Sequence, residues 1–401
     1  MEAGRDLLGD TEDQAALRAL AREVAAKELA PRAAAWDEQE RFPDEAWAAF
    51  TQAGLPAITI GEEFGGAGLG DVEAAIVLEE LARADVSSAI LLQLVYNGAP
   101  RAIEHLGTDA AKEHWLPRAA SGESLFCLGI TEAEAGSAVM EMRATLTADG
   151  DGWVLNAYKN YVTGGHRADA CLVWTRFPGS EGARGIGSVV VDLHAEGVSV
   201  TGTHKKMGLR GVTEAELAFD GVAVSRDDVI VHGDDATAFR TLLDHLNHER
   251  CGNAAMCIGA AHGALEHAVT YASDRVVGGR RLSDIQGLQW KFADMATELE
   301  AARLLLYRAV GLAGRHGTPP ALETGMAKAK ANLAAKYVCD EAIQLLGGYG
   351  YSREYPVERI YRDIRGLNIG AGTVEVQRNY VGSRVAAGRR PSGPAWRDIL
   401  H

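Results

Sequence analysis

A cluster of glycines near the C-terminal end of this 401-residue chain is the first group of residues whose spacing suggests chemistry. Gly347, Gly348 and Gly350 lie in the segment LGGYGY. Without side chains, such a turn lets backbone N–H groups approach a phosphate closely. The same spacing also occurs in turns with a purely structural role, so the loop by itself leaves both interpretations open.

Four further motifs accompany this loop in a fixed order along the chain. They are EEFGGAGLG at 62–70, GITEAEAGS at 129–137, YVTGG at 161–165 and KMGLRG at 206–211. Together with LGGYGY and the pair Arg362 and Asp363, they resemble the acyl-CoA dehydrogenase family along nearly the whole chain. The resemblance implies an FAD-dependent enzyme acting on CH–CH groups of acyl thioesters.

The resemblance places the flavin ring beside two of these motifs. An isoalloxazine ring needs hydrogen-bond donors along its polar edge and a flat partner against its face. By motif match, Tyr161 stands where the family usually has a stacking Trp, and Thr163 lies near N5 and O4 of the ring. The match adds four further flavin contacts, of which Ser137 also binds substrate: Leu128, Thr131, Gly136 and Ser137.

The adenosine diphosphate end of FAD needs cations or backbone donors for its pyrophosphate. Arg275 and Gln286 match family residues that reach this part of the cofactor, often across a subunit boundary. The other contacts that the resemblance implies come from the glycine loop and from the segment after it: Gln344, Gly347, Gly348, Thr373 and Glu375.

The carboxylate that removes the substrate α-proton is absent from its usual place. The family commonly has Glu directly before Gly-Thr, whereas IGAGT has Ala371 there. A methyl group accepts no proton, but the backbone N–H remains, and in the family it helps to bind the thioester carbonyl. By the same match, Gly372 contacts substrate.

Glu249 is the candidate replacement base, because a carboxylate in an apolar pocket suits this proton transfer. It matches the helix position that isovaleryl-CoA dehydrogenase-like members use for their catalytic Glu; a role as a charge partner is the other interpretation. Arg250 matches a position near the thioester and pantetheine arm, and an ordinary salt bridge is its alternative. His248 points about 100° away from Glu249 on a helix, so we expect it to be structural.

Other functions on the same scaffold remain open. EAGSAVMEM, IQGLQW and IGAGT are similar to segments of sulfinopropionyl-CoA desulfinases, FAD-containing lyases that lack the usual base, but Ile90 stands where that branch has its sulfinate-binding Arg. A flavin monooxygenase and a catalytically silent thioester-binding relative are two further alternatives. GVTEAEL at 211–217 departs from the family pattern, so the thioester carrier is CoA or a carrier protein.

Composition limits the partners. A formal net charge of -15 disfavours nucleic acid, which requires a basic face. Five scattered cysteines without a CxxC pair fit reduced thiols and a cytoplasmic location. No apolar run approaches the ~18 residues of a membrane span, and we expect no metal ligands in the site. The resemblance implies an electron-transfer flavoprotein as acceptor and a homotetramer, or a homodimer.

The residue patterns predict a mainly helical α+β fold with three domains. Helix formers with apolar residues three or four apart dominate an N-terminal helical domain at 1–122. Alternating runs broken by Gly and Asp predict a middle antiparallel β-domain at 123–234, with FPGSEGARGIG as a hairpin loop. Helical periodicity then predicts a C-terminal four-helix bundle at 235–401, in which Ser283 and Gln286 form a capping box.

Overall fold

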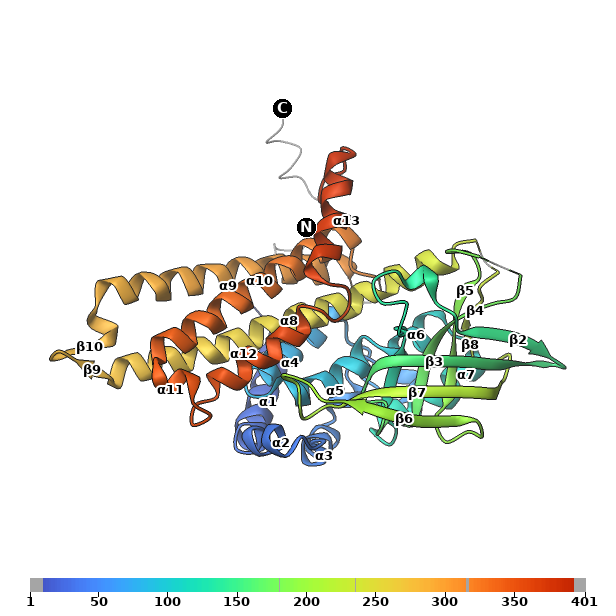
Figure 1. Cartoon of the computed structure of the whole chain (residues 1–401), viewed down its shortest axis with the longest axis horizontal. Coiled ribbons are helices and arrows are strands. Elements are labelled where there is room, and N and C mark those ends of the chain that lie inside the picture. Colours follow the sequence, from blue (N-terminus) through green and yellow to red (C-terminus); the bar gives the residue numbers. More distant parts are fainter. Residues whose placement is uncertain (1–9, 180, 235, 315–316, 393–401) are drawn as a thin grey trace. The chain divides into compact units, whose positions relative to one another are not determined.

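The computed structural model describes residues 10–179, 181–234, 236–314 and 317–392 (Figure 1). The chain forms two compact units. The helical unit comprises Met1–Ala34, Asp71–Ala89 and Arg250–His401, and the sheet unit comprises Ala35–Gly70 and Ile90–Glu249. The division falls inside the long helix α8 (Ala238–Asp274), between Glu249 and Arg250.

The sheet unit contains one eight-stranded sheet in the order β6-β7-β3-β2-β4-β5-β8, with β1 beside β4. Alternating apolar residues in short runs, each ended by Gly or Asp, produce these strands. Their bounds are β1 Phe126–Gly129, β2 Thr145–Asp149, β3 Gly152–Thr163, β4 Ala170–Arg176, β5 Ile186–Asp192, β6 Val198–His204, β7 Glu214–Val224 and β8 Val229–Val231. The predicted hairpin is confirmed, because β4 and β5 pair antiparallel on either side of it.

Most strand pairs of the sheet are antiparallel, as the sequence predicts, but two are parallel. β1 runs parallel to β4, with Phe126 opposite Ala170, and Thr145 of β2 makes a parallel bridge with Arg176 of β4. The 130–144 segment separates β1 from β2, so β1 pairs with a strand over 40 residues away rather than closing a hairpin. Strand alternation predicts the faces of a strand but not such a non-local partner.

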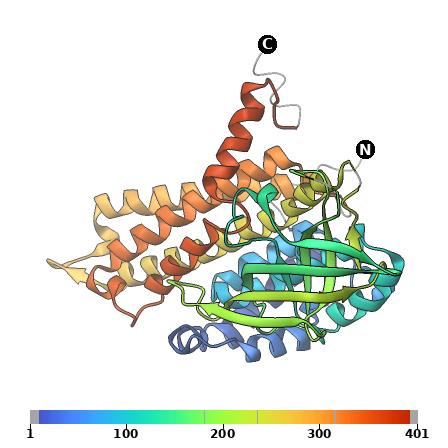
Figure 2. The ribbon, with the colours of Figure 1, turned by 45° about the vertical axis from the view of Figure 1, so that its right-hand side comes forward.

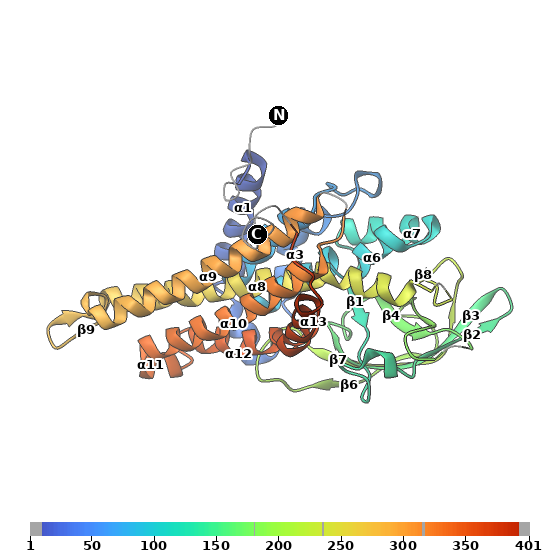
Figure 3. The ribbon, with the colours of Figure 1, turned by 90° about the horizontal axis from the view of Figure 1, so that it is seen from above.

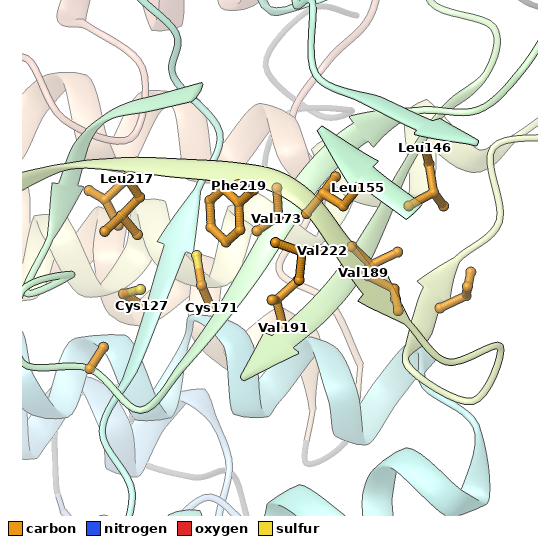
Figure 4. Packing of buried hydrophobic residues seen from close by; sticks show 14 of the residues in the cluster. Cys127, Leu146, Leu155, Cys171, Val173, Val189, Val191, Leu217, Phe219 and Val222 are labelled. Atoms are coloured by element: carbon orange, nitrogen blue, oxygen red, sulfur yellow. The ribbon is translucent and has the colours of Figure 1, made fainter. Parts of the chain in front are cut away.

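One face of the sheet builds an apolar core (Figure 4). Leu155, Val173 and Phe219 come from three different strands and are at most 2% exposed. Cys127 and Cys171 lie in the same core as small apolar side chains. All five cysteines are free and buried, and burial raises the pKa of the Cys251 and Cys257 thiols to about 12, so these thiols are inert at neutral pH.

Helices complete the sheet unit (Figure 2). Trp115 of α7 packs edge-on against Phe126 of β1, with ring centroids 6.0 Å apart, and its indole N–H donates to Asp228 at 3.0 Å. Besides the first part of α8, the helices with all or part of their length in this unit are α2 Ala33–Gln39, α3 Asp44–Gln52, α5 Val86–Tyr96, α6 Ala99–Leu106 and α7 Asp109–Ala120. The short 3-10 turns Leu55–Ala57 and Glu62–Phe64 join them.

Long helices dominate the helical unit (Figure 3). α10 packs against α9, α12 and α13, and the small hairpin β9–β10 (Val276–Val277 and Arg280–Arg281) connects α8 with α9. Besides α8, the helices are α1 Glu12–Val24, α4 Asp71–Ala82, α9 Gln286–Ala313, α10 Ala321–Leu346, α11 Gly348–Tyr351, α12 Val357–Leu367 and α13 Val374–Ala386. A π-helical turn, Ala25–Leu29, extends α1.

The capping box predicted at Ser283 and Gln286 is wrong. Ser283 lies inside the 3-10 turn Leu282–Asp284, and α9 begins at Gln286 after Ile285, which makes no side-chain cap. The capping box that the structure does contain joins Thr11 and Gln14 at the start of α1. An apolar seam of α9 is fully buried from Met295 onward and continues through Leu299 and Leu306.

Among the described residues, no helix is both long and apolar enough to cross a membrane.

Candidate active site

The end of β3 presents Tyr161 as a flat, exposed ring. Its φ of 53° is rare for a bulky residue, and the backbone N–H of Tyr161 donates to the side chain of Asn160 at 2.8 Å, which supports this conformation. The ring stacks on His204, with centroids 4.3 Å apart and planes inclined by 11°. Tyr161 nevertheless remains 58% exposed, so it can still offer surface to a second flat ring.

The loop that follows β1 is anchored beside Tyr161. The backbone N–H of Asn160 donates to the carbonyl of Thr131 at 2.8 Å, which holds the start of the GITEAEAGS motif against the end of β3. Leu128 is half-buried in β1, whereas Gly136 and Ser137 are exposed further along the loop. The four predicted contacts therefore lie along one segment, of which Thr131 is bonded to the residue that precedes Tyr161.

A buried ion pair stabilises this loop. The Lys159 ammonium, which is 0% exposed, donates to the Glu132 carboxylate at 2.8 Å and to the Ile130 carbonyl at 3.2 Å. The same carboxylate accepts the backbone N–H groups of Arg143 and Ala144. Burial acts to raise the pKa of Glu132, but Lys159 and these N–H donors outweigh it and lower that pKa, so the carboxylate stays ionised.

Thr163 is held by the neighbouring strand. Its hydroxyl donates to Glu214 of β7 at 2.8 Å, and Glu214 also forms an ion pair with Lys206 at 3.3 Å. Glu214 belongs to the GVTEAEL segment that departs from the family pattern. The departure thus supplies a carboxylate that fixes the rotamer of Thr163 and leaves the lone pairs of its hydroxyl oxygen available to a donor.

The glycine loop lines a cavity of about 580 Å³ within the helical unit. Arg275 lines the same cavity as Gly347 and Gly348, so the predicted cation and the predicted backbone donors converge there. The remaining lining residues are Tyr271, Leu282, Leu345, Leu346, Tyr349, Ser352 and Glu354. A guanidinium, a glycine turn and aromatic rings fit the phosphate and adenosine parts of a dinucleotide.

The three glycines of this loop have different physical roles. Gly347 ends α10 with φ 61° and ψ -131°, a conformation open essentially to glycine alone. A Cβ at Gly350 would lie 2.3 Å from the carbonyl oxygen of Ile343, so close packing requires that glycine. A Cβ at Gly348 would meet nothing within 4 Å, and Gly348 lines the cavity. Gly347 lines the cavity too, but its N–H already donates to the carbonyls of Ile343 and Gln344, so Gly348 is the glycine of the two whose backbone we expect to meet a ligand.

The turn at Ala371 keeps a defined shape without a carboxylate. Ala371 and Gly372 both have positive φ, 54° and 84°. The carbonyl of Gly372 accepts a hydrogen bond from Lys328, which is 0% exposed, at 2.8 Å. The backbone N–H groups of Ala371 and Gly372 donate to no acceptor among the described residues, so both can bind a substrate carbonyl.

Buried polar side chains extend beneath this turn. Lys328 also donates to Asn332 at 3.1 Å, and Asn332 donates to Asn253 of α8 at 3.0 Å. Asn253 in turn donates to the carbonyl of Leu367 at the end of α12. These bonds tie α8, α10 and α12 to the turn, so its shape depends on the packed helices rather than on the side chain at 371.

The remaining predicted residues of the helical unit lie at helix termini. Thr373 caps α13 by accepting the N–H of Val376 at 3.2 Å, and Glu375 lies in the first turn, where backbone and Thr373 donors lower its pKa. Gln344 and Gln286 are exposed at the ends of α10 and α9, and neither lines the cavity.

Glu249 and Arg250 are both half-buried in α8. The Gln93 side chain of α5 donates to the backbone carbonyl of Glu249 at 3.0 Å, which anchors this turn of α8 within the sheet unit.

An aromatic group beside the cavity is a feature that the sequence patterns did not predict. Tyr271, Tyr349 and Tyr355 pack together, with ring centroids 5.7 to 6.2 Å apart. The Tyr within LGGYGY was a visible signal, whereas Tyr271 comes from a helix whose periodicity does not mark it.

Comparison with known proteins agrees with this geometry. Models of the acyl-CoA dehydrogenase N-terminal, middle and C-terminal domains match residues 11–123, 127–222 and 239–386. The probable acyl-CoA dehydrogenase fadE25 of Mycobacterium leprae is 38% identical over 93% of this chain and 95% of that protein.

Two solved structures extend the similarity. Butyryl-CoA dehydrogenase from Megasphaera elsdenii is 31% identical with a TM-score of 0.90, over 94% of this chain and 99% of that one. A chain from a study of the electron transferring flavoprotein of Acidaminococcus fermentans is 33% identical with a TM-score of 0.90, over the same shares. This chain has the family's helical, β and helical domains and is a flavin-dependent oxidoreductase that acts on CH–CH groups. It belongs to the acyl-CoA dehydrogenase family.

Proposed function

We propose that the protein carries out FAD-dependent α,β-dehydrogenation of an acyl-CoA thioester, or of an acyl-carrier thioester, with Glu249 as the base. The observation that carries the proposal is the turn at Ala371. It keeps two available N–H donors and positive φ values at 371 and 372, yet it has no carboxylate. Activity then requires a base from another element, and Glu249 of α8 is our candidate.

The residues present fit FAD. The cavity of about 580 Å³ with Arg275 and Gly348 suits the pyrophosphate and adenosine, and the exposed Tyr161 ring suits the isoalloxazine. Bound FAD would supply the acceptor for the hydride that leaves Cβ. Arg275 and the backbone N–H groups of the glycine loop would then neutralise and orient the phosphates.

The turn at Ala371 would bind the thioester carbonyl oxygen through backbone N–H groups. Because Lys328 fixes the Gly372 carbonyl, these donors are oriented before substrate arrives. One preorganised donor at a developing oxyanion is worth on the order of 10²- to 10³-fold in rate. Arg250 would contact the pantetheine arm, and Glu249 would take the α-proton onto its carboxylate.

Glu249→Gln tests the base. We expect the rate at which saturated acyl-CoAs reduce the flavin to fall at least ~100-fold, because a positioned base contributes about 10²- to 10⁴-fold. Bleaching of the flavin absorption under anaerobic conditions measures this rate. FAD content should not change. Glu113→Gln, at an exposed position of α7, is the matched control.

A second variant separates a missing base from a damaged fold. In the Glu249→Gln background, Ala371→Glu returns a carboxylate to the family's usual place and should recover part of the bleaching. Bleaching by Glu249→Gln at the wild-type rate contradicts the assignment of Glu249. Flavin that no thioester bleaches in the wild type contradicts dehydrogenation itself.

A desulfinase-like lyase is the second candidate, and the same Ala371 turn favours it, because a lyase of that branch needs no base there. Ile90, at the position of the branch's sulfinate-binding Arg, is an apolar residue only 6% exposed, which argues against a sulfinate substrate. Release of product with flavin left oxidised and no electron acceptor added would favour the lyase.

We further propose a cytoplasmic homotetramer, or a homodimer, that passes electrons to an electron-transfer flavoprotein. The similarity to a chain studied with such a protein supports the acceptor. Exposed apolar side chains on the helical unit, Trp290 and Leu312 among them, support assembly.

A further inference from the structure

Three histidines of the sheet unit converge outside the flavin and thioester residues. His105 comes from α6, and His245 and His248 come from the part of α8 that belongs to this unit. One ring nitrogen of each lies within 4.8 Å of the others. The ring centroids are 5.1 to 6.0 Å apart, with the rings edge-on or tilted rather than stacked. The three rings thus surround a common point.

Helix geometry explains why they meet. His245 and His248 are three residues apart and so project from the same side of α8. Their side of α8 is buried: His245 is 8% exposed and His248 is 0% exposed, while His105 is half-buried. Burial means that the four ring nitrogens of His245 and His248 must find partners other than bulk water.

His245 shows how one of those nitrogens is left available. Its ring makes a hydrogen bond to the backbone of Gly98, and among the described residues its Nε2 has no partner, so the bond to Gly98 comes from Nδ1. A backbone carbonyl that accepts one ring N–H leaves the lone pair of the other nitrogen directed outward, as in histidines that bind metal.

We propose that His105, His245 and His248 bind one divalent transition-metal ion of the Zn²⁺ class. Neutral imidazole is a preferred ligand of Zn²⁺, and three protein ligands leave a fourth position for water. Zn–N bonds of about 2.0–2.1 Å place tetrahedral ligand nitrogens roughly 3.4 Å apart, so the rings must close slightly around the ion. Small χ rotations of His105, the least buried ring, provide this movement.

The ion would fasten α6 to the turn of α8 that immediately precedes Glu249. The ion would have a structural role, because no substrate group would bind to it. The metal site is therefore independent of the proposed dehydrogenation. Arg101, 3% exposed and near His245, repels a cation, so we expect micromolar rather than picomolar affinity.

Metal uptake by the FAD-loaded full chain tests the site. After treatment with a chelator, the protein is dialysed against Zn²⁺ and metal is measured by elemental analysis; Co²⁺ then reports a four-coordinate site by its visible absorption. We expect one ion per chain, and a rise in the melting temperature with added Zn²⁺.

Two variants and one control make the test specific. His245→Asn keeps a donor for Gly98 but removes the ligand nitrogen, and His105→Phe keeps an aromatic ring; each should lower Zn²⁺ affinity at least tenfold. His114→Asn, at an exposed position of α7, should bind as the wild type does. Failure of the wild type to retain Zn²⁺ or Co²⁺, or equal uptake by wild type and both ligand variants, overturns the proposal and leaves an apolar imidazole cluster.

Discussion

At the residue scale, the three glycines of the loop have different roles: two of them allow the backbone its shape, and one of them is expected to meet a ligand. Gly347 provides a conformation that other residues avoid, Gly350 provides room for the Ile343 carbonyl, and Gly348 provides an open face to the cavity. The motif LGGYGY does not reveal this division, because the three glycines look equivalent in the sequence.

Gly348→Ala and Gly350→Ala should therefore affect different properties: FAD affinity in the first variant and stability in the second. The Cβ at 350 forces the packed α10 terminus apart, which we expect to lower the free energy of unfolding by about 1–3 kcal/mol. The Cβ at 348 meets no protein atom, so stability should hold while FAD affinity falls. Urea unfolding and flavin content per chain measure the two effects; equal loss of stability in both variants contradicts the assignment.

At the element scale, α1 and α4 are joined through buried charges. Glu80 of α4 is 3% exposed and accepts from Arg18 and Arg22 of α1, at 2.9 Å in each case. Burial acts to raise the pKa of Glu80, but these arginines outweigh it and lower the pKa below its ordinary 4.5. The contacts of Glu80 with the two arginines therefore contribute their full stabilisation above pH 4.5. This contribution is lost as the pH falls through the lower pKa that Glu80 has in the folded state.

Glu80→Gln removes the buried carboxylate that Arg18 and Arg22 share. Arg18 keeps its ion pair with Asp10 at 2.6 Å and the Arg22 side chain is 56% exposed, so we expect the free energy of unfolding to fall by about 1–3 kcal/mol at pH 7. The loss should shrink as the pH falls from 4.5 through the lower pKa of the folded state, where the wild-type carboxylate itself becomes protonated. Glu23→Gln removes the exposed pair with Lys27 on the same helix and should change stability little. Chemical unfolding of the wild type and both variants, at pH 7 and at a pH below 4.5, measures these changes in stability. A loss of stability in Glu80→Gln that is the same at both pH values contradicts the prediction.

The same scale shows what the sequence could and could not predict. Helix and strand textures arise from local patterns, so the element types and the β4–β5 hairpin were predictable. The parallel partner of β1 and the meeting of His105 with His245 join residues far apart in the chain, and periodicity carries no such information. The predicted cap of α9 was wrong because Ser283 lies inside a 3-10 turn, and the sequence pattern of a capping box does not distinguish such a turn from a helix start.

At the scale of the whole molecule, one chain leaves apolar surface exposed. Trp290 is 63% exposed on α9, although the seam further along that helix is fully buried. An indole on a helix surface is typical of a residue that packs against another subunit. The exposure supports the proposed assembly of several copies.

Trp290→Glu should therefore shift the protein from a tetramer towards smaller species, because it places a charge in an apolar contact. Light scattering coupled to size-exclusion chromatography measures the mass. Val200→Glu, at an exposed position of β6 in the other unit, is the control and should leave the mass unchanged. A variant with the wild-type mass shows that this face does not take part in assembly.

The turn at 371 owes its form to Lys328 and the asparagines below it, not to whatever residue occupies position 371. We therefore expect that the residue at position 371 can be replaced without changing the shape of the turn. A thiol, an imidazole or a carboxylate installed there would lie beside the two N–H donors that we propose bind the thioester carbonyl, so protein engineers could exchange the reactive group at this position without changing the backbone.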